Sequence, residues 1–516
     1  MVELTDDTRR EIGQHFVVGF HGYDVSPDIE LLIRDYHVGN IILMKRNVKS
    51  AKQVHALVQK LQQIAKSAGH ERPLMIGMDQ ENGLVSAFSV AHSNDAGTQF
   101  PGAMALAAAG SPDVAERITE ASALELKLAG INWAYSPVGD VNSDPAKPCV
   151  RSFGDVPEEV SKYVTAVCRG LTKAGIAPSV KHFPGHGDTH IDSHIALPII
   201  SKDAASLAQN DLVPFRAASD AGVATIMVGH MALPAITGDT VPASLSHAVI
   251  GGLLRDSLGY GGVVVTDCLE MAARGPSLGH AGLRASGQRI AALKDAFAGG
   301  WEQVLGREFD EAGWARLKAA HVALSRQTYA ASIALVRNPG AVVPLPKSGA
   351  TVVLTPRMES LNRAVDDDDD DRQRPARKNT AGSSYMALAE SVRKRVDGAS
   401  VHVVYAPDEP LGGAELQDAA SVLFVTRNAD RSTWQLDRLR AVLRLGKRVV
   451  VLASYAPYDL LAAPPDIEGL CDVGYVASFE FTAGALDAAA AVIFGEEVAK
   501  GKVPVCGANV LPDWFP

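Results

Sequence analysis

Four histidines and two aspartates lie within thirteen residues of this chain, from His182 to His194. The segment has the sequence HFPGHGDTHIDSH and follows a short apolar run at residues 175–180 that predicts a buried strand. A core segment would not tolerate so many polar groups, because each one needs a buried partner. Titratable side chains on a glycine-containing loop at a strand end are typical of an active site.

Two kinds of chemistry fit this loop. Asp192 and His194 are two residues apart, so their side chains point the same way in an extended segment. A carboxylate that holds one imidazole N–H raises the basicity of the other nitrogen, which makes a general acid/base pair. The plain alternative is a buried histidine satisfied by its neighbour. The rival chemistry is a hydrolytic metal centre, with ligands from His182, His186, Asp188, His190, Asp192 and His194. No HExxH or spaced CxxC motif supports the metal centre.

Other polar residues follow apolar runs elsewhere in the chain. Asp267 ends the run 263–266, where it could be a nucleophile, a metal ligand or a helix N-cap, and spacing alone does not choose among them. Asp79 begins an Asp-Gln-Glu triplet after the run 74–78, and such groups suit sugar hydroxyls or a solvated turn. Lys181, His182 and Arg151 add cationic donors.

The elements that must position these residues alternate between strands and helices. We predict strands at 16–20, 40–43, 74–78, 132–135, 178–182, 225–228 and 263–266, and helices at 51–68, 112–128, 158–174 and 207–221. Repeated β-then-α units with continuous apolar strands predict a parallel sheet covered by helices. Polar residues at the ends of many strands favour a (β/α)8-type barrel over a doubly wound sheet. Only seven strands are identified, so the eighth is predicted to be missing or cryptic.

A second α/β domain is predicted after the barrel. We place the catalytic domain at 1–335, a Pro- and Gly-containing linker at 336–349 and the second domain at 350–516. Its predicted strands are 351–354, 401–405, 422–425, 448–452 and 473–477, and its helices are 385–396, 432–445 and 483–493. A charged insertion at 363–384 includes six consecutive aspartates and is predicted to be disordered.

Composition excludes several classes of protein. The net charge is −10 and no basic stripe is present, so nucleic acid is not an expected partner. No apolar run is long enough to span a membrane, and the acidic N-terminus lacks the apolar region of a secretory signal. The five cysteines are scattered and odd in number, which is typical of free thiols in a reducing compartment. We therefore predict a cytoplasmic protein and leave its oligomeric state open.

The His-rich segment closely resembles the signature of glycoside hydrolase family 3 β-N-acetylglucosaminidases. The resemblance rests on KHFPGHGDT at 181–189, then Asp192-Ser193-His194 and Leu197-Pro198. Supporting stretches are the Asp-Gln-Glu triplet, RSFG at 151–154, VVTDCLEM at 264–271 and SIALVRN at 332–338. Together they cover nearly the whole chain. The family fold is a barrel followed by an α/β sandwich domain.

The resemblance implies a retaining, two-step hydrolysis of small saccharides with terminal β-linked N-acetylglucosamine. Asp267 would attack the anomeric carbon, and His194, oriented by Asp192, would act as acid and then base. Asp79, Arg151, Lys181 and His182 would bind the sugar, and neither a cofactor nor a metal is expected. The same histidine chemistry raises the hypothesis that phosphate replaces water.

The chain also departs from the family pattern. After Met271 the family usually continues with a helix and the eighth barrel strand. Here a segment on the order of fifty residues is absent, which is longer than a typical loop. Position 87 is Ala where many relatives have Arg, and position 268 is Cys where many have Asp. Two alternatives to a glycosidase therefore stay open: an inactive or sugar-binding paralogue with an incomplete barrel, and a metal-dependent hydrolase.

Overall fold

The computed structural model describes residues 5–89, 95–143, 149–186, 197–269, 280–357, 382–409, 411, 413–460 and 468–505. These residues pack as two compact units. The first holds Met1–Phe100, Ala115–Val141 and Pro157–Ala323, and the second holds Pro101–Val114, Asn142–Val156 and Leu324–Pro516. The boundary falls inside helix α12 (Glu311–Ser332). The sequence-based limits of 1–335, 336–349 and 350–516 concern segments that fold independently, and they stay a prediction.

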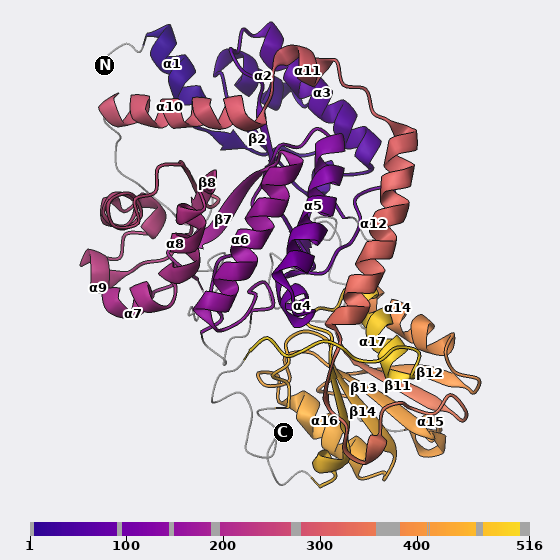
Figure 1. The fold of residues 1–516 in the computed structure, drawn as a ribbon. Helices are drawn as coiled ribbons and strands as arrows, with labels where there is room; N and C mark the ends of the chain where they lie inside the picture. Colours follow the sequence, from indigo (N-terminus) through magenta and orange to yellow (C-terminus); the bar gives the residue numbers. More distant parts are fainter. Residues whose placement is uncertain are drawn as a thin grey trace. The chain divides into compact units, whose positions relative to one another are not determined.

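A seven-stranded parallel sheet forms the centre of the first unit (Figure 1). Its strands follow one another in space in their chain order, as in a barrel wall. They are β1 (Val17–Val18), β2 (Asn40–Leu43), β3 (Met75–Met78), β6 (Trp133–Ala134), β7 (Ala177–Phe183), β8 (Thr225–Val228) and β9 (Val263–Thr266). All seven predicted strands are present, and no eighth strand joins this sheet among the described residues. A short hairpin, β4 (Gln80–Asn82) and β5 (Val85–Ser86), follows β3.

Amphipathic helices cover the strands, because each helix has apolar residues along one face, as the sequence pattern predicts. Helix α6 (Pro157–Ala174) buries Val160, Val164, Val167 and Leu171, which recur at helical spacing on one face. Ser50 is the N-cap of helix α3 (Ala51–Ser67), and its hydroxyl accepts a hydrogen bond from the amide of Gln53. Helix α5 (Pro112–Leu128) has the predicted bounds.

The helix predicted at 207–221 is wrong as a single element. It is two helices, α7 (Ala204–Gln209) and α8 (Leu212–Asp220). Between them the Asp211 carboxylate is buried, and it accepts a hydrogen bond from Lys202 Nζ at 2.9 Å. This tertiary ion pair fixes the connection and interrupts the periodic pattern.

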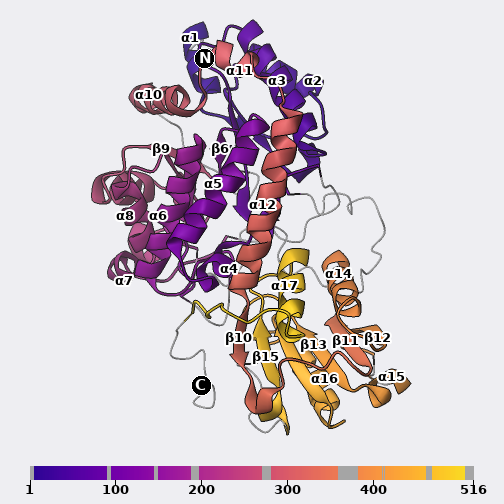
Figure 2. The ribbon, with the colours of Figure 1, turned by 45° about the vertical axis from the view of Figure 1, so that its right-hand side comes forward.

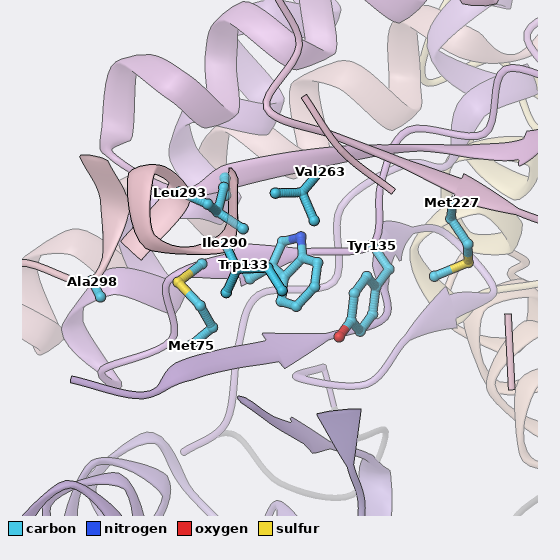
Figure 3. Close-up of a cluster of buried hydrophobic side chains, with 9 residues drawn as sticks. Met75, Trp133, Tyr135, Met227, Val263, Ile290, Leu293 and Ala298 are labelled. Atoms are coloured by element: carbon cyan, nitrogen blue, oxygen red, sulfur yellow. The ribbon is translucent and has the colours of Figure 1, made fainter. Parts of the chain in front are cut away.

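Helix α10 (His280–Phe297) supplies part of the core that the strands enclose (Figure 3). Ile290 and Leu293 point from this helix toward Trp133 and Val263, which come from β6 and β9. The other buried members of the cluster are Met75, Tyr135, Ala177, Met227 and Ala298. The interior of a closed barrel is filled by strand side chains alone. Here a helix that follows the last strand fills part of that space.

Lys294 anchors the same helix by burying an amine. Its Nζ donates to Gln14 Oε1 at 2.6 Å and to the carbonyl of Gly39 at 2.8 Å, and the residue is 1% exposed. Burial lowers the pKa of Lys294 to about 7, and the charge on Arg72 acts in the same direction. The amine therefore ties α10 to the N-terminal segment and to β2.

We expect this buried amine to give a measurable pH dependence of stability. An unfolded lysine keeps its proton up to about pH 10.4, whereas the folded Lys294 loses it near pH 7. Between these values the unfolded state binds more protons, so the free energy of unfolding should rise with pH. Urea unfolding from pH 7 to 9 should show a rise of at least about 1 kcal/mol that Lys294→Met lacks. Equal slopes for the two proteins would contradict a neutral buried amine.

A six-stranded sheet forms the second unit (Figure 2). Its spatial order is β10 (Ala334–Arg337), β15 (Gly474–Ala477), β14 (Arg448–Ala453), β13 (Ser421–Thr426), β11 (Thr351–Pro356) and β12 (Ser400–Tyr405). The strands from β11 to β15 are the five that the sequence predicts, and they pair in parallel. Helices α14 (Gly382–Arg393) and α17 (Ala483–Ile493) pack against each other over this sheet, and α16 is Trp434–Leu443.

Strand β10 was not predicted. It pairs antiparallel with β15 at the edge of the sheet, and its first residues had been assigned to the barrel and its last to the linker. The earlier segment Pro101–Val114 also belongs to the second unit. The Glu480 carboxylate accepts a hydrogen bond from the amide of Gly102 at 2.7 Å, and the amide of Lys502 donates to the carbonyl of Ala108 at 2.9 Å.

Two predictions from composition can be compared with the described residues. The four cysteines among them are free thiols: Cys149, Cys168, Cys268 and Cys471. No helix in the described ranges combines the length and the apolar character needed to cross a membrane. The predicted disordered insertion at 363–384 lies outside the described residues except at its C-terminal end, where α14 begins at Gly382.

Candidate active site

Polar side chains gather where the parallel strands of the first unit end. Asp79 follows β3 and Asp267 follows β9. Lys181 and His182 lie near the C-terminal end of β7. Because β3, β6, β7, β8 and β9 are parallel neighbours, their carboxyl ends meet at one rim of the sheet. The sequence therefore predicted correctly which end of the strands carries these residues.

Lys181 lies between two carboxylates. Its Nζ is 2.6 Å from Asp79 Oδ1 and 2.6 Å from Glu81 Oε1. The side chains of Lys181 and Glu81 are 3% and 6% exposed, so the ion pairs are shielded from water. The side chain of Asp79 is 27% exposed. An ammonium with two acceptors holds both acids in fixed positions at the rim, and Asp79 keeps a face that a ligand can reach.

Asp140 fixes the orientation of His182. Its Oδ2 lies 2.8 Å from His182 Nδ1, and its Oδ1 accepts hydrogen bonds from the amides of His182 at 3.1 Å and His186 at 2.8 Å. Burial alone would raise the pKa of Asp140, but His182 and His186 beside it bring that pKa below its ordinary value. An ionised carboxylate only accepts hydrogen bonds, so Nδ1 of His182 carries a proton.

We expect Asp140→Ala to lower the free energy of unfolding by about 2–4 kcal/mol, because two buried amides and one imidazole lose their acceptor. The sugar contact that the family resemblance implies for His182 should weaken as well, since His182 is then free to turn. Urea unfolding and a substrate-saturation curve measure the two effects. Asp239→Ala is the matched control, because Asp239 is an exposed turn aspartate of the same unit that accepts one amide hydrogen bond. Similar losses in both variants would contradict an orienting role for Asp140.

Asp267 is held in its ionised form. Its Oδ1 accepts a hydrogen bond from the amide of Cys268 at 2.8 Å, and its own amide donates to the carbonyl of Val228 at 2.9 Å. Burial acts to raise the pKa of Asp267, but His182, the Cys268 amide, Lys181 and His230 outweigh it, so the pKa lies below the ordinary value. The carboxylate is thus charged, with the Cys268 amide as a hydrogen-bond donor and Lys181, His182 and His230 acting to lower its pKa.

His230 supports the segment that carries Asp267. It is buried, with Nδ1 2.6 Å from Ser244 Oγ and Nε2 2.8 Å from the carbonyl oxygen of Cys268. The imidazole therefore fastens the residue next to Asp267 to the segment 243–245. The helix N-cap alternative for Asp267 stays open, because a cap binds an amide two or three residues on and Glu270 lies outside the described residues.

Other predicted residues are not brought into this cluster by the described structure. Asp192 and His194 lie outside the described residues, as do Asp188 and His190 of the alternative metal centre. Within the described ranges no three His, Cys, Asp or Glu side chains are grouped as a metal site. Arg151 belongs to the second unit.

Sequence reasoning included Glu81 in the Asp-Gln-Glu triplet but did not predict the contacts that Glu81, Asp140 and His230 make. Each one has a sequence signal, since each closely follows an apolar strand. Their pairings with Lys181, His182 and Cys268 join residues 100, 42 and 38 positions apart, and local patterns carry no information about such pairs.

A family model decides the relationship that the signature suggested. Residues 7–285, more than half of the chain, match the glycosyl hydrolase family 3 N terminal domain. The chain belongs to glycosyl hydrolase family 3. The matched region contains every strand of the seven-stranded sheet and the rim residues described above.

Two β-hexosaminidases are each similar to about half of the chain. β-Hexosaminidase A of Pseudoalteromonas piscicida is 38% identical over 266 residues, which are 48% of this chain and 44% of that protein. A β-hexosaminidase of Chromobacterium violaceum is 34% identical over 275 residues, 52% of this chain and 71% of that protein. The chain thus spans less than half of the first relative and about seven tenths of the second.

Solved structures are similar over almost the whole chain. A fungal multi-domain family 3 β-N-acetylglucosaminidase, with an additional glucosamine N-acetyltransferase region, matches with a TM-score of 0.85 and 32% identity. That match covers 98% of this chain and 61% of the fungal one. A family 3 β-N-acetylglucosaminidase from Paenibacillus matches with a TM-score of 0.76 and 28% identity, covering 98% and 99%. The fold of a barrel-like unit followed by an α/β unit is therefore confirmed.

Proposed function

We propose that this family 3 protein is a retaining glycosidase that removes terminal β-linked N-acetylglucosamine from small saccharides or glycoconjugates. The observation that carries the proposal is the position of Asp267 at the strand-end rim, directly after β9, with its Oδ1 held by the Cys268 amide at 2.8 Å. A carboxylate held charged among donors is ready to act as a nucleophile. The names of its relatives supply the sugar, because they are β-hexosaminidases and β-N-acetylglucosaminidases.

The proposed reaction has two steps. Asp267 attacks the anomeric carbon and forms an ester bond while the glycosidic C–O bond breaks, and His194 gives the leaving oxygen its proton. Water then attacks the same carbon, His194 takes the proton of that water, and the Asp267 carboxylate leaves. Asp192 orients His194 throughout. Double displacement at one carbon retains the β configuration of the sugar.

The proposed sugar contacts divide by charge. Asp79 would accept hydrogen bonds from hydroxyl groups through its exposed face, while Lys181 and Arg151 would donate to hydroxyl or acetamido oxygens. His182, with its Nδ1 proton held by Asp140, would present its other ring nitrogen to the sugar. We propose a cytoplasmic location and a small saccharide substrate, with no cofactor.

The test is release of 4-nitrophenol from its β-N-acetylglucosaminide by the purified protein. We expect turnover that a chelator does not abolish, and NMR of the first product should show the β anomer. Mass spectrometry after a slow fluorinated N-acetylglucosaminide should find the sugar on the peptide that contains Asp267. Loss of activity on chelation, restored by a divalent metal, would instead favour the metal-dependent hydrolase.

One observation favours a second candidate, an inactive or sugar-binding paralogue. The sheet has seven strands in the described part of the chain, where a (β/α)8 barrel has eight. The wall beside β9 is thus built differently. A protein that unfolds cooperatively and binds N-acetylglucosamine, but releases no nitrophenol, would support this candidate over the glycosidase.

A further inference from the structure

The loop that carries Arg151 is built into the second unit. Residues 142–156 connect two parts of the first unit along the chain, since they follow Val141 and precede α6. The described residues of this stretch, 142–143 and 149–156, nevertheless group with the second unit, and Asn142 contacts Tyr458 in the segment after β14. Val150 precedes Arg151, and Ser152 and Phe153 follow it. Val150 and Phe153 are each 5% exposed, and Ser152 is 1% exposed. The short segment around Arg151 is therefore anchored by its neighbours on both sides.

Asn142 is the centre of this anchoring. Its amide donates to the carbonyl of Gly154 at 2.9 Å, and its Oδ1 accepts from the amide of Cys149 at 3.2 Å. One residue thus binds the backbone two positions before Arg151 and three positions after it. Asn142 is 2% exposed, so these hydrogen bonds do not compete with bulk water.

Tyr458 fastens Asn142 to the second unit. Its hydroxyl accepts a hydrogen bond from Asn142 Nδ2 at 2.8 Å, and Tyr458 is 1% exposed. Burial, followed by the nearby Asp155 carboxylate, raises the pKa of the Tyr458 hydroxyl, which stays neutral. Gly154 lies against the same unit, because a Cβ there would come within 2.5 Å of the carbonyl oxygen of Pro504.

The charge of Arg151 also affects the pKa of Tyr455 in this unit. Burial and the Cys149 thiol raise the pKa of Tyr455, while Arg427, Arg431 and Arg151 act to lower it. Tyr455 is the second residue after β14, three residues before Tyr458, and Arg427 directly follows β13. Residues that follow two strands of the second sheet are thus close enough to Cys149 and Arg151 to interact electrostatically with them.

We infer that Tyr458, acting through Asn142, is a positioning residue for Arg151. The inference rests on the proposed function, in which Arg151 binds the glycone. A residue that orients a uniform binding contact changes KM more than kcat. Tyr458→Phe removes only the hydroxyl and keeps the ring, so the core around it stays filled.

The decisive experiment is a double-mutant cycle with steady-state kinetics on the aryl N-acetylglucosaminide. Tyr458→Phe should raise KM by about three- to tenfold, the effect of one lost hydrogen bond, with kcat within about twofold of wild type. In an Arg151→Ala background the same substitution should change KM little, since the group it positions is gone. Additive effects of the two substitutions would overturn the inference.

Tyr405→Phe is the matched control. Tyr405 lies in β12 and is also 1% exposed. Its hydroxyl donates a hydrogen bond to the carbonyl of Val425 at 2.7 Å. It should lose similar stability by thermal unfolding and leave KM unchanged. An equal rise of KM in both variants would show a general loss of structure and would also overturn the inference.

A wild-type protein without turnover would defeat the proposed function and leave this inference decidable by other means. Calorimetric titration with N-acetylglucosamine compares the Kd of Tyr458→Phe with that of Tyr405→Phe, and only Tyr458→Phe should bind the sugar more weakly than wild type. Hydrogen exchange reports on the loop itself: amides of residues 149–154 should exchange faster in Tyr458→Phe than in Tyr405→Phe. Unchanged Kd and unchanged exchange in Tyr458→Phe would rule out the positioning role.

Discussion

Asp267→Asn should lower kcat/KM for an aryl β-N-acetylglucosaminide by at least about 10³-fold, which corresponds to about 4 kcal/mol of transition-state stabilisation. The amide nearly matches the carboxylate in shape but cannot form the glycosyl ester. The hydrogen bond from the Cys268 amide can persist to the amide oxygen. The loss should therefore appear in the rate and not in thermal stability.

Asp256→Asn is the control for this substitution. Asp256 is an exposed aspartate of the same unit, on the helical segment Ala248–Ser257, and it should keep full activity. The pH profile gives a second check, because the lowered pKa of Asp267 places its acid limb below the ordinary aspartate range. Full activity of Asp267→Asn would remove Asp267 from the mechanism.

Lys181→Met should have the largest effect on stability. The substitution keeps the length of the side chain but leaves Asp79 and Glu81 facing each other without their shared cation. Breaking a buried ion pair by removing one partner costs about 3–5 kcal/mol, because the remaining charge is desolvated and uncompensated. Urea unfolding measures this loss, and turnover should fall with it, since Lys181 also faces Asp267.

Two further variants separate the causes. Adding Asp79→Asn and Glu81→Gln to Lys181→Met should recover part of the lost stability, because the repelling charges are gone. Lys173→Met removes an exposed lysine that lies 2.6 Å from Glu120, and it should change stability little. If the triple variant is no more stable than Lys181→Met, charge repulsion does not explain the effect.

Local pattern was sufficient for most of the fold. Apolar runs such as 40–43 and 225–228 matched the observed strands because buried parallel strands are continuous in apolar residues. β10 was missed because its pairing with β15 joins residues more than 130 positions apart. The break between α7 and α8 was missed for a similar reason, since a buried carboxylate with a lysine partner leaves no periodic signal.

The candidate site divides in the same way. The strand ends identified the rim and the signature identified Lys181, His182 and Asp267. Neither could show that Asp140 holds His182, because that contact depends on how β7 lies beside the segment after β6. The membership of Arg151 in the second unit depends on a tyrosine more than 300 residues later. The proposed acid/base, Asp192 and His194, stays a prediction from the signature.

Helix α10 shows that filling a barrel and closing it are separate tasks. A helix satisfies its own backbone hydrogen bonds, so α10 can supply Ile290 and Leu293 to the interior without pairing with β1 or β9. Its position then depends on side-chain packing, on Lys294 and on the ion pair between Asp295 and Arg72, and no ladder fixes its register. A lineage could therefore lose a strand–helix repeat while the remaining strands keep a covered interior. In such a chain the rigidity of the rim near β9 would be set by helix packing, which tolerates sliding that a hydrogen-bonded strand does not.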